Sequence, residues 1–189
     1  MKKSPKPIEH AEVKFPCVIF DLDGTLADVT TRRDIANHAK MSSQPPVQAE
    51  GETRFLYKKR IAKHHSDAWW KRWQDPDVVK TDKPNTPVVN ICKLLKEYMG
   101  CAIIITSART DRNMAVTKEW LADNNIYYDE LFMRPDGDFT RDDKFKKRIL
   151  NKYILPKYEV LMCFDDRNQV VNMWRSNGIT CLQVADGDF

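Results

Sequence analysis

The sequence lacks three features that would each point to a particular class of protein. It has no GxxxxGK[ST] pattern, so no P-loop ATP site is expected. No apolar run approaches the roughly 20 residues that cross a membrane, and no apolar core follows the N-terminal lysines, so we expect neither a membrane span nor a signal peptide. The five cysteines form no CxxC pair and mostly lie in apolar runs, which indicates buried thiols, a reducing cytoplasm and no zinc site.

The composition is that of an ordinary globular chain with a mild positive charge. A length of 189 residues predicts one domain with room for a small inserted one, and an apolar fraction of 42% is typical of a globular fold. The formal charge of +4 does not by itself argue for nucleic acid. We expect a disordered basic arm over residues 1–14, a core formed by residues 15–28 and 86–189, and a helical insertion over residues 29–85.

Short apolar runs alternate with amphipathic helical patterns along most of the chain. The four runs occupy residues 17–20, 101–106, 160–164 and 179–185. The first three are continuous, as in strands that are buried on both faces of a parallel sheet. The helical patterns occupy residues 87–99, 111–123, 143–154 and 167–177, the first with Thr86 as its expected N-cap. This alternation predicts an α/β fold with a parallel sheet flanked by helices.

The segment between Asp28 and Thr86 interrupts the alternation. It contains no strand candidate, residues 42–51 have the composition of a loop, and the pattern of residues 52–73 predicts one or two helices. We therefore expect a small helical cap inserted after the first strand.

Carboxylates and a hydroxyl follow the three central strands, at the sheet edge where ligands of such folds bind. The strands end in Asp21-Leu22-Asp23, Thr106-Ser107-Ala108-Arg109 and Asp165-Asp166-Arg167. Each aspartate taken alone is best explained as a helix or turn cap. Four carboxylates at one edge repel one another unless a hard cation lies among them, so together they predict a site for Mg²⁺ and a phosphate.

The spacing of Asp21 and Asp23 suits phosphoryl transfer. In an extended chain, residues two apart point to the same side, so both carboxylates can address one substrate atom. Asp21 is the candidate nucleophile, which would form an aspartyl-phosphate. Asp23 is the candidate acid that protonates the leaving oxygen and then the base that activates water.

The ordered motifs resemble those of the haloacid dehalogenase (HAD) superfamily of phosphohydrolases. DxDGT occurs in "FDLDGT", "IIITS" forms the second run and "FDD" ends the third. The resemblance implies the same roles for Asp21 and Asp23, which would both bind Mg²⁺, Asp23 through its backbone carbonyl. It also implies that Asp165 is a direct metal ligand and Asp166 a supporting residue.

The same resemblance implies two groups that hold the phosphoryl oxygens. Ser107 matches the hydroxyl of the family best, with Thr106 as the alternative. The lysine of the family must come from "DDKFKKRIL", in which Lys146 shares a helix face with apolar residues whereas Lys144 shares one with charged residues. We therefore choose Lys146, the alternative being that it is one more surface lysine.

A longer and more specific resemblance covers most of the chain outside residues 29–85. The stretches "DDRNQVVNMWRSNGITCLQVADGDF" and "RPDGDFTRDDKFK" are similar to the phosphatase domain of phage polynucleotide kinase/3′-phosphatases. This implies removal of a 3′-phosphate from DNA or RNA ends, with Arg109 and Arg134 as substrate-binding side chains. Each arginine has an alternative role as a surface or helix-cap residue. The missing P-loop predicts no 5′-kinase activity, and we expect the longer insertion to affect substrate choice.

The insertion is basic and rich in aromatic residues. Residues 52–73 contain seven Lys or Arg against two acids, a net charge of +5, and interleaved with them are Phe55, Tyr57, Trp69, Trp70 and Trp73. Basic surfaces with aromatic platforms bind single-stranded nucleic acid by charge and stacking. The alternative is a cap whose aromatic residues form its own core and whose lysines are solvated.

Three functions are consistent with these patterns. The first is a Mg²⁺-dependent 3′-phosphatase that acts on nucleic-acid ends in repair. The second is a HAD nucleotidase that acts on free mononucleotides, with the insertion as a lid. The third is a nucleic-acid-binding module with an idle site, against which the intact set of candidate catalytic residues argues. We favour the first, and the sequence leaves the oligomeric state open.

Overall fold

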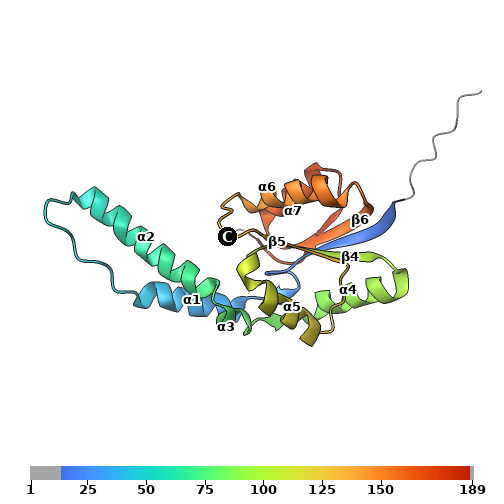
Figure 1. The fold of residues 1–189 in the computed structure, drawn as a ribbon, viewed down its shortest axis with the longest axis horizontal. Helices are drawn as coiled ribbons and strands as arrows, with labels where there is room; N and C mark the ends of the chain where they lie inside the picture. The colour runs from blue at the N-terminus through green and yellow to red at the C-terminus, as the bar shows by residue number, and fades with distance from the viewer. Residues whose placement is uncertain (1–13, 188–189) are drawn as a thin grey trace, which may run out of the picture.

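The computed structural model describes residues 14–187, so the predicted basic arm over residues 1–14 lies outside the described residues except for its last position. At the centre is a parallel sheet of five strands in the order β5-β4-β1-β6-β7. The strands are β1 (Phe15–Asp21), β4 (Ala102–Thr110), β5 (Glu130–Arg134), β6 (Tyr158–Asp165) and β7 (Cys181–Gln183). The sheet and the helices around it confirm the predicted α/β fold (Figure 1).

Helices cover both faces of the sheet. α4 (Thr86–Met99) and α5 (Met114–Asp123) pack on one face, whereas α6 (Asp142–Ile149), its π-helical continuation η2 (Leu150–Ile154) and α7 (Asn168–Ser176) pack on the other (Figure 1). Alternate side chains of β1 divide the core between the two layers. Val18 and Phe20 belong to the cluster with α4 and α5, and Cys17 and Ile19 belong to the cluster with α6 and α7. β1 is thus buried on both sides, as its continuous apolar run predicts.

The strand register aligns the ends of the three central strands. Asp21 pairs with Thr106 of β4, and Phe20 pairs with Phe164 of β6. The residues that follow each strand therefore emerge at one edge of the sheet, which we call the catalytic edge.

Four local features differ from the sequence expectations. β5 lies outside the four apolar runs, because it is a half-buried edge strand with a charged residue at each end. The segment from residue 28 to residue 86 is not free of strands, since β2 (Ala27–Asp28) and β3 (Lys83–Pro84) form an antiparallel pair. Asn85, not Thr86, is the N-cap of α4, because Thr86 already begins the helix. The predicted helix over residues 111–123 begins as a 3₁₀ turn, η1 (Asp111–Asn113).

The insertion projects from the core as a helical hairpin, residues 30–73 (Figure 1). α1 (Thr30–Ser42) leads away from the sheet, α2 (Arg54–Trp73) returns to it, and the short α3 (Pro76–Val79) leads on to β3. α2 is one continuous helix of 20 residues, about 30 Å long. It has no buried residue. None of the helices within residues 14–187 combines the length and the apolar character that a membrane span requires.

Candidate active site

Three aspartates form a compact cluster at the catalytic edge. Asp21 ends β1, Asp165 ends β6 and Asp166 follows directly. One carboxylate oxygen from each lies within 4.8 Å of the others, and all three side chains are buried. This acidic cluster is a consequence of the sheet register, because β1 and β6 are hydrogen-bonded neighbours that end side by side.

Lys146 reaches into the acidic cluster from α6. Its Nζ lies 2.6 Å from Oδ1 of Asp21 and 2.8 Å from Oδ2 of Asp165. It is buried whereas Lys144 is exposed, as their helix faces predict. Burial lowers the pKa of Lys146, but the carboxylates of Asp165 and Asp21 outweigh burial and raise the pKa above its ordinary value. The ammonium group therefore stays charged.

The acidic cluster carries more negative charge than Lys146 neutralises. Three carboxylates and one ammonium leave a formal charge of −2. Burial raises the pKa of Asp21, and Asp165 and Asp166 add to this shift while Lys146 opposes it. Burial and the neighbouring Asp165 raise the pKa of Asp166 to about 6. A divalent cation would remove the excess charge, and carboxylate oxygens are the ligands that Mg²⁺ prefers, so these residues fit the predicted metal.

Asp165 and Asp166 differ in how far their oxygens are already occupied. Oδ2 of Asp165 accepts from Lys146 and from Nε1 of Trp174 at 3.1 Å, and its Oδ1 accepts from the backbone N–H of Arg167 at 3.2 Å. Within residues 14–187, no other residue donates a hydrogen bond to the Asp166 carboxylate. That Asp165 binds the metal with Asp166 in support stays a prediction, and these contacts favour Asp166 as the freer ligand.

Gly24 allows Asp166 to approach the turn after β1. Its φ is +91°, and a Cβ at this position would lie 2.1 Å from Oδ2 of Asp166. The turn itself is closed by backbone bonds, from the N–H of Gly24 to the carbonyl of Ala27 at 2.8 Å and from the N–H of Ala27 to the carbonyl of Leu22 at 2.8 Å. The glycine of DxDGT thus serves both a left-handed backbone and a close carboxylate.

Asp23 lies outside the acidic cluster and belongs to a ring of four charges. Nη2 of Arg32 lies 2.6 Å from Oδ1 of Asp23, and Nε of Arg32 lies 3.1 Å from Oδ1 of Asp82. Arg109 also forms an ion pair with Asp23, and its Nη2 lies 3.0 Å from Oδ2 of Asp82. We call these four residues the ion-pair ring. It joins the end of β1, the first turn of α1, the segment before β3 and the end of β4.

The ion-pair ring separates the pKa values of its two aspartates. Burial raises the pKa of Asp23, but the guanidinium groups of Arg109 and Arg32 outweigh burial and bring the pKa well below its ordinary value. For Asp82 burial prevails over the same two arginines, and Asp23 adds to the effect, which raises the pKa to about 7. Asp23 is therefore held as a carboxylate in this structure.

Arg32 and Asp82 are functional candidates that the sequence reasoning missed. Both are buried, Arg32 completely. Their sequence surroundings, "TTRRD" and "KTDKP", show two ordinary polar stretches of the insertion. The only available signal is indirect. Two aspartates, Asp21 and Asp23, lie close together at the end of one strand and need positive charges nearby, and Arg32 of the insertion is one of these charges.

Thr106 and Ser107 are both fully buried at the end of β4. Oγ of Ser107 accepts from the backbone N–H of Arg109 at 3.1 Å. Oγ1 of Thr106 has no hydrogen-bond partner, and Thr106 is the register partner of Asp21. Ser107 as phosphate ligand stays a prediction, and the unpartnered hydroxyl of Thr106 supports the alternative that was left open.

Arg134 is engaged by the loop that leads into α6. Its Nε donates to the carbonyl of Ala108 at 3.0 Å, its Nη1 donates to the carbonyls of Asp138 and Thr140, and its Nη2 pairs with Asp142. These contacts fix the start of α6, and therefore Lys146 one turn further on. Direct contact of Arg134 with substrate stays a prediction.

Asp142 is a third residue that the sequence reasoning missed. It pairs with both Arg134 and Arg167 at the N-terminus of α6. Its position four residues before Lys146 places both side chains on one helix face, which is the signal that would have found it.

Comparisons with known proteins agree on one relationship. Residues 61–189 match the family described as the polynucleotide kinase PNKP phosphatase domain. A protein of Autographa californica nuclear polyhedrosis virus, named as a bifunctional polynucleotide kinase/RNA ligase, is 34% identical over 101 residues, which are 51% of this chain and 14% of that protein. A chain in the structure of the Pnkp1/Rnl/Hen1 RNA repair complex is 28% identical with a TM-score of 0.67, over 100% of this chain and 48% of that chain.

A more distant structure shares the fold alone. A phosphatase from Clostridium difficile has a TM-score of 0.65 at 16% identity, over 91% of this chain and 86% of that chain. This chain spans about half of the chain of the RNA repair complex and a small part of the viral protein.

Proposed function

Because this chain belongs to the family of polynucleotide kinase (PNKP) phosphatase domains, which are HAD phosphatases, we propose that it removes the 3′-phosphate from DNA or RNA ends. The observation that carries the proposal is the contact of Lys146 with both Asp21 and Asp165. This contact supports the proposal, because it joins the proposed nucleophile Asp21, the proposed phosphoryl-binding cation Lys146 and the proposed metal ligand Asp165.

The five buried, unpaired cysteines support a reducing cytoplasmic setting.

Asp21 is the nucleophile of the proposed reaction. One of its carboxylate oxygens attacks phosphorus, the bond between phosphorus and the 3′-oxygen breaks, and an aspartyl-phosphate forms. Water then attacks the same phosphorus, which releases phosphate and restores the carboxylate. Lys146 lies within hydrogen-bond distance of Asp21 and stabilises the charge on the transferred phosphoryl oxygens. Ser107, or Thr106 in its place, donates a hydroxyl hydrogen bond to the same oxygens.

Asp23 moves the protons of both steps. It donates a proton to the leaving 3′-oxygen and later accepts one from the attacking water. The arginines of the ion-pair ring favour its carboxylate form, which is the form that accepts a proton. The donor form requires the arginines to loosen their hold. A phosphate dianion favours this, because it competes for the guanidinium of Arg109 and raises the pKa of neighbouring acids.

The acidic cluster is the proposed Mg²⁺ site. Asp21, Asp166 and Asp165 would hold the ion together with the backbone carbonyl of Asp23. When bound, it would supply Lewis-acid stabilisation of the phosphoryl charge.

Phosphate release from a panel of substrates tests the proposal. The panel contains one oligonucleotide with a 3′-phosphate, the same oligonucleotide with a 5′-phosphate, and 3′- and 5′-mononucleotides, each as DNA and RNA. We expect the highest kcat/KM on the 3′-phosphorylated oligonucleotide. Higher kcat/KM on free mononucleotides would instead favour the nucleotidase, and no release from any phosphoester would leave a binding module with an idle site.

A further inference from the structure

One face of α2 carries a stripe of exposed side chains. Its members are spaced three or four residues apart and therefore share a helix face: Phe55, Lys59, Lys63, Ser66 and Trp70. We propose that this stripe binds the single strand of nucleic acid that lies 5′ to the cleaved phosphate. The inference rests on the proposed function and assigns a second site to the same substrate.

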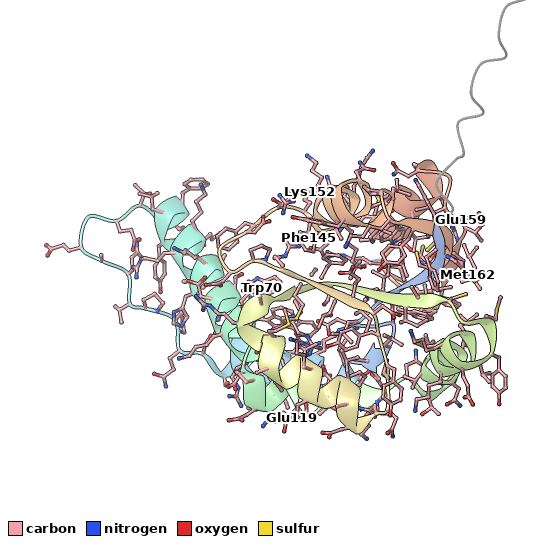
Figure 2. The ribbon with its side chains drawn as sticks, turned by 45° about the vertical axis from the view of Figure 1, so that its right-hand side comes forward. Trp70, Glu119, Phe145, Lys152, Glu159 and Met162 are labelled. Atoms are coloured by element: carbon pink, nitrogen blue, oxygen red, sulfur yellow. The ribbon has the colours of Figure 1, made fainter. Side chains whose placement is uncertain are left out.

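The stripe leads to the catalytic edge. Trp73 and Gln74 come three and four residues after Trp70, so they continue the same face to the end of α2. At this end α2 contacts the core, because the backbone carbonyl of Gln74 accepts from Nδ2 of Asn113 at 3.0 Å. The ring of Trp73 lies over Arg32 of α1, with its centre 4.1 Å from the guanidinium carbon, and Arg32 in turn pairs with Asp23. The face of α2 that is exposed further out thus ends beside Arg32, a residue of the ion-pair ring. Figure 1 shows α2 running from the tip of the hairpin to the core, and Figure 2 places Trp70 on its part nearest the core.

The lysines of the stripe are not neutralised by the protein. Within residues 14–187, no carboxylate lies within ion-pair distance of Lys59 or Lys63, whereas the neighbouring Arg60 pairs with Glu52 at 2.7 Å. Nζ of Lys59 lies 5.4 Å from the centre of the Phe55 ring. Unpaired cations beside aromatic rings offer a polynucleotide contacts for its phosphates and its bases together.

The aromatic residues at the two ends of the stripe are unusually exposed for their size. Phe55 is 68% exposed and Trp70 is 50% exposed. Beside Trp70 lies a shallow hollow of about 210 Å³ between the helices, which is lined by Lys40, Ser66 and Trp69 among others. A ring next to a hollow with a lysine at its rim suits a stacked base and its phosphate.

The length of the stripe sets the number of nucleotides it holds. Phe55 and Trp70 are separated by 15 residues, which is about 22 Å along a helix. This corresponds to about six stacked nucleotides at roughly 3.4 Å each. The wild-type kcat/KM should therefore rise from a 3′-mononucleotide to an oligonucleotide of about seven, which is about six nucleotides on the stripe plus the one that carries the phosphate, and then level off.

Two pairs of lysines on the same helix provide a matched experiment. Lys59→Gln/Lys63→Gln removes two charges from the stripe, and Lys58→Gln/Lys71→Gln removes two charges from other sides of α2. The quantity to measure is the ratio of kcat/KM on a 3′-phosphorylated 10-mer to kcat/KM on the 3′-mononucleotide, over a range of salt concentrations. A third variant, Phe55→Ala/Trp70→Ala, tests stacking at constant charge.

The stripe variants should lower the ratio and the control should keep it. For two lost contacts, the slope of log ratio against log salt should become less negative by about 1.4 for Lys59→Gln/Lys63→Gln. Phe55→Ala/Trp70→Ala should lower the ratio at least about fivefold. The inference would be overturned if the stripe and control pairs had equal effects, or if the ratio of the two kcat/KM values did not change in the stripe variants. The exposed face of α2 would then be a candidate surface for a protein partner. Because the wild type would still release 3′-phosphate from oligonucleotides, that failure is distinct from a failure of the proposed function.

Discussion

The catalytic edge and the hairpin are both rich in charge, but they use it in opposite ways. At the edge, Asp21, Asp23 and Lys146 are largely removed from water and each has partners of opposite sign at ion-pair distance. On the hairpin, Lys59 and Lys63 are exposed, and no residue of α2 is buried. Buried pairs hold a fixed geometry, which phosphoryl transfer requires. Exposed, unpaired cations adapt to a flexible polymer, and their contribution weakens as salt rises.

The two regions meet at Arg32. It lies in the first turn of α1, is fully buried, and contacts Asp23 and Asp82 of the ion-pair ring. The ring of Trp73, at the end of α2, lies over its guanidinium. Both ends of the hairpin therefore touch one residue that contacts the candidate general acid. A movement of the hairpin would therefore change the position of the Arg32 guanidinium relative to the carboxylate of Asp23.

The contrast is tested most severely by Asp21→Asn. An amide cannot attack phosphorus, so the rate should fall on the order of 10⁴–10⁶-fold, as for the loss of a nucleophile. Phosphate release from a 3′-phosphorylated oligonucleotide measures it. Lys58→Gln, which removes one charge from an exposed residue of α2 outside the stripe, is the control and should keep the wild-type rate. Substantial turnover by purified Asp21→Asn protein would sink the aspartyl-phosphate mechanism.

The second largest loss of rate is expected when divalent metal is removed. A chelator should lower the rate on the order of 10³-fold, Mg²⁺ should restore it, and Ca²⁺ should substitute poorly because its larger coordination shell misplaces the nucleophile. The formal charge of −2 on the acidic cluster also predicts that Mg²⁺ raises the Tm of the wild type, and raises it less in Asp166→Asn. Full activity in chelator would refute the assignment of the cluster as a cation site.

The third prediction concerns proton transfer. Asp23→Asn should lower the rate on the order of 10²–10⁴-fold on oligonucleotides, because the leaving 3′-oxygen loses its acid. The loss should shrink on aryl phosphates, whose leaving groups need less protonation. An equal loss on both substrates would mean that Asp23 serves the ion-pair ring or the metal instead.

The sequence predicts what depends on local pattern and misses what depends on distant contact. The buried strands follow from their continuous apolar runs. The burial of Lys146 and the exposure of Lys144 follow from periodicity, because burial on a helix face repeats every three to four residues. β5 could not be predicted from the sequence, since an edge strand needs no continuous apolar run. Arg32 and Asp82 could not be predicted either, because the ion pairs of Asp82 with Arg32 and Arg109 join residues that lie more than 20 positions apart in the sequence.

The smallest expected effect lies within the ion-pair ring, in Asp82→Asn. The folded-state pKa of Asp82 is raised from 3.8 to about 7, so the stability from its protonated form is present below about pH 4 and is lost as pH rises through about 7. Asparagine imitates the protonated form at every pH. The Tm of the variant minus that of the wild type should therefore rise between pH 4.5 and pH 8, by roughly 5 °C for an effect on the order of 2 kcal/mol.

Thermal melts of both proteins across this pH range decide whether the ion-pair ring raises or lowers the pKa of Asp82. Taking the difference between variant and wild type cancels the other carboxylates that titrate there, Asp166 among them. Asp67→Asn, at an exposed residue of α2, is the matched control for loss of an aspartate. A Tm difference that stays flat between pH 4.5 and pH 8 would have the opposite meaning, because an aspartate with a lowered folded-state pKa is ionised in both the folded and the unfolded state throughout this range. In that case the guanidinium groups of Arg32 and Arg109 outweigh burial at Asp82 as they do at Asp23, and the buried ring is held together by two ionised aspartates.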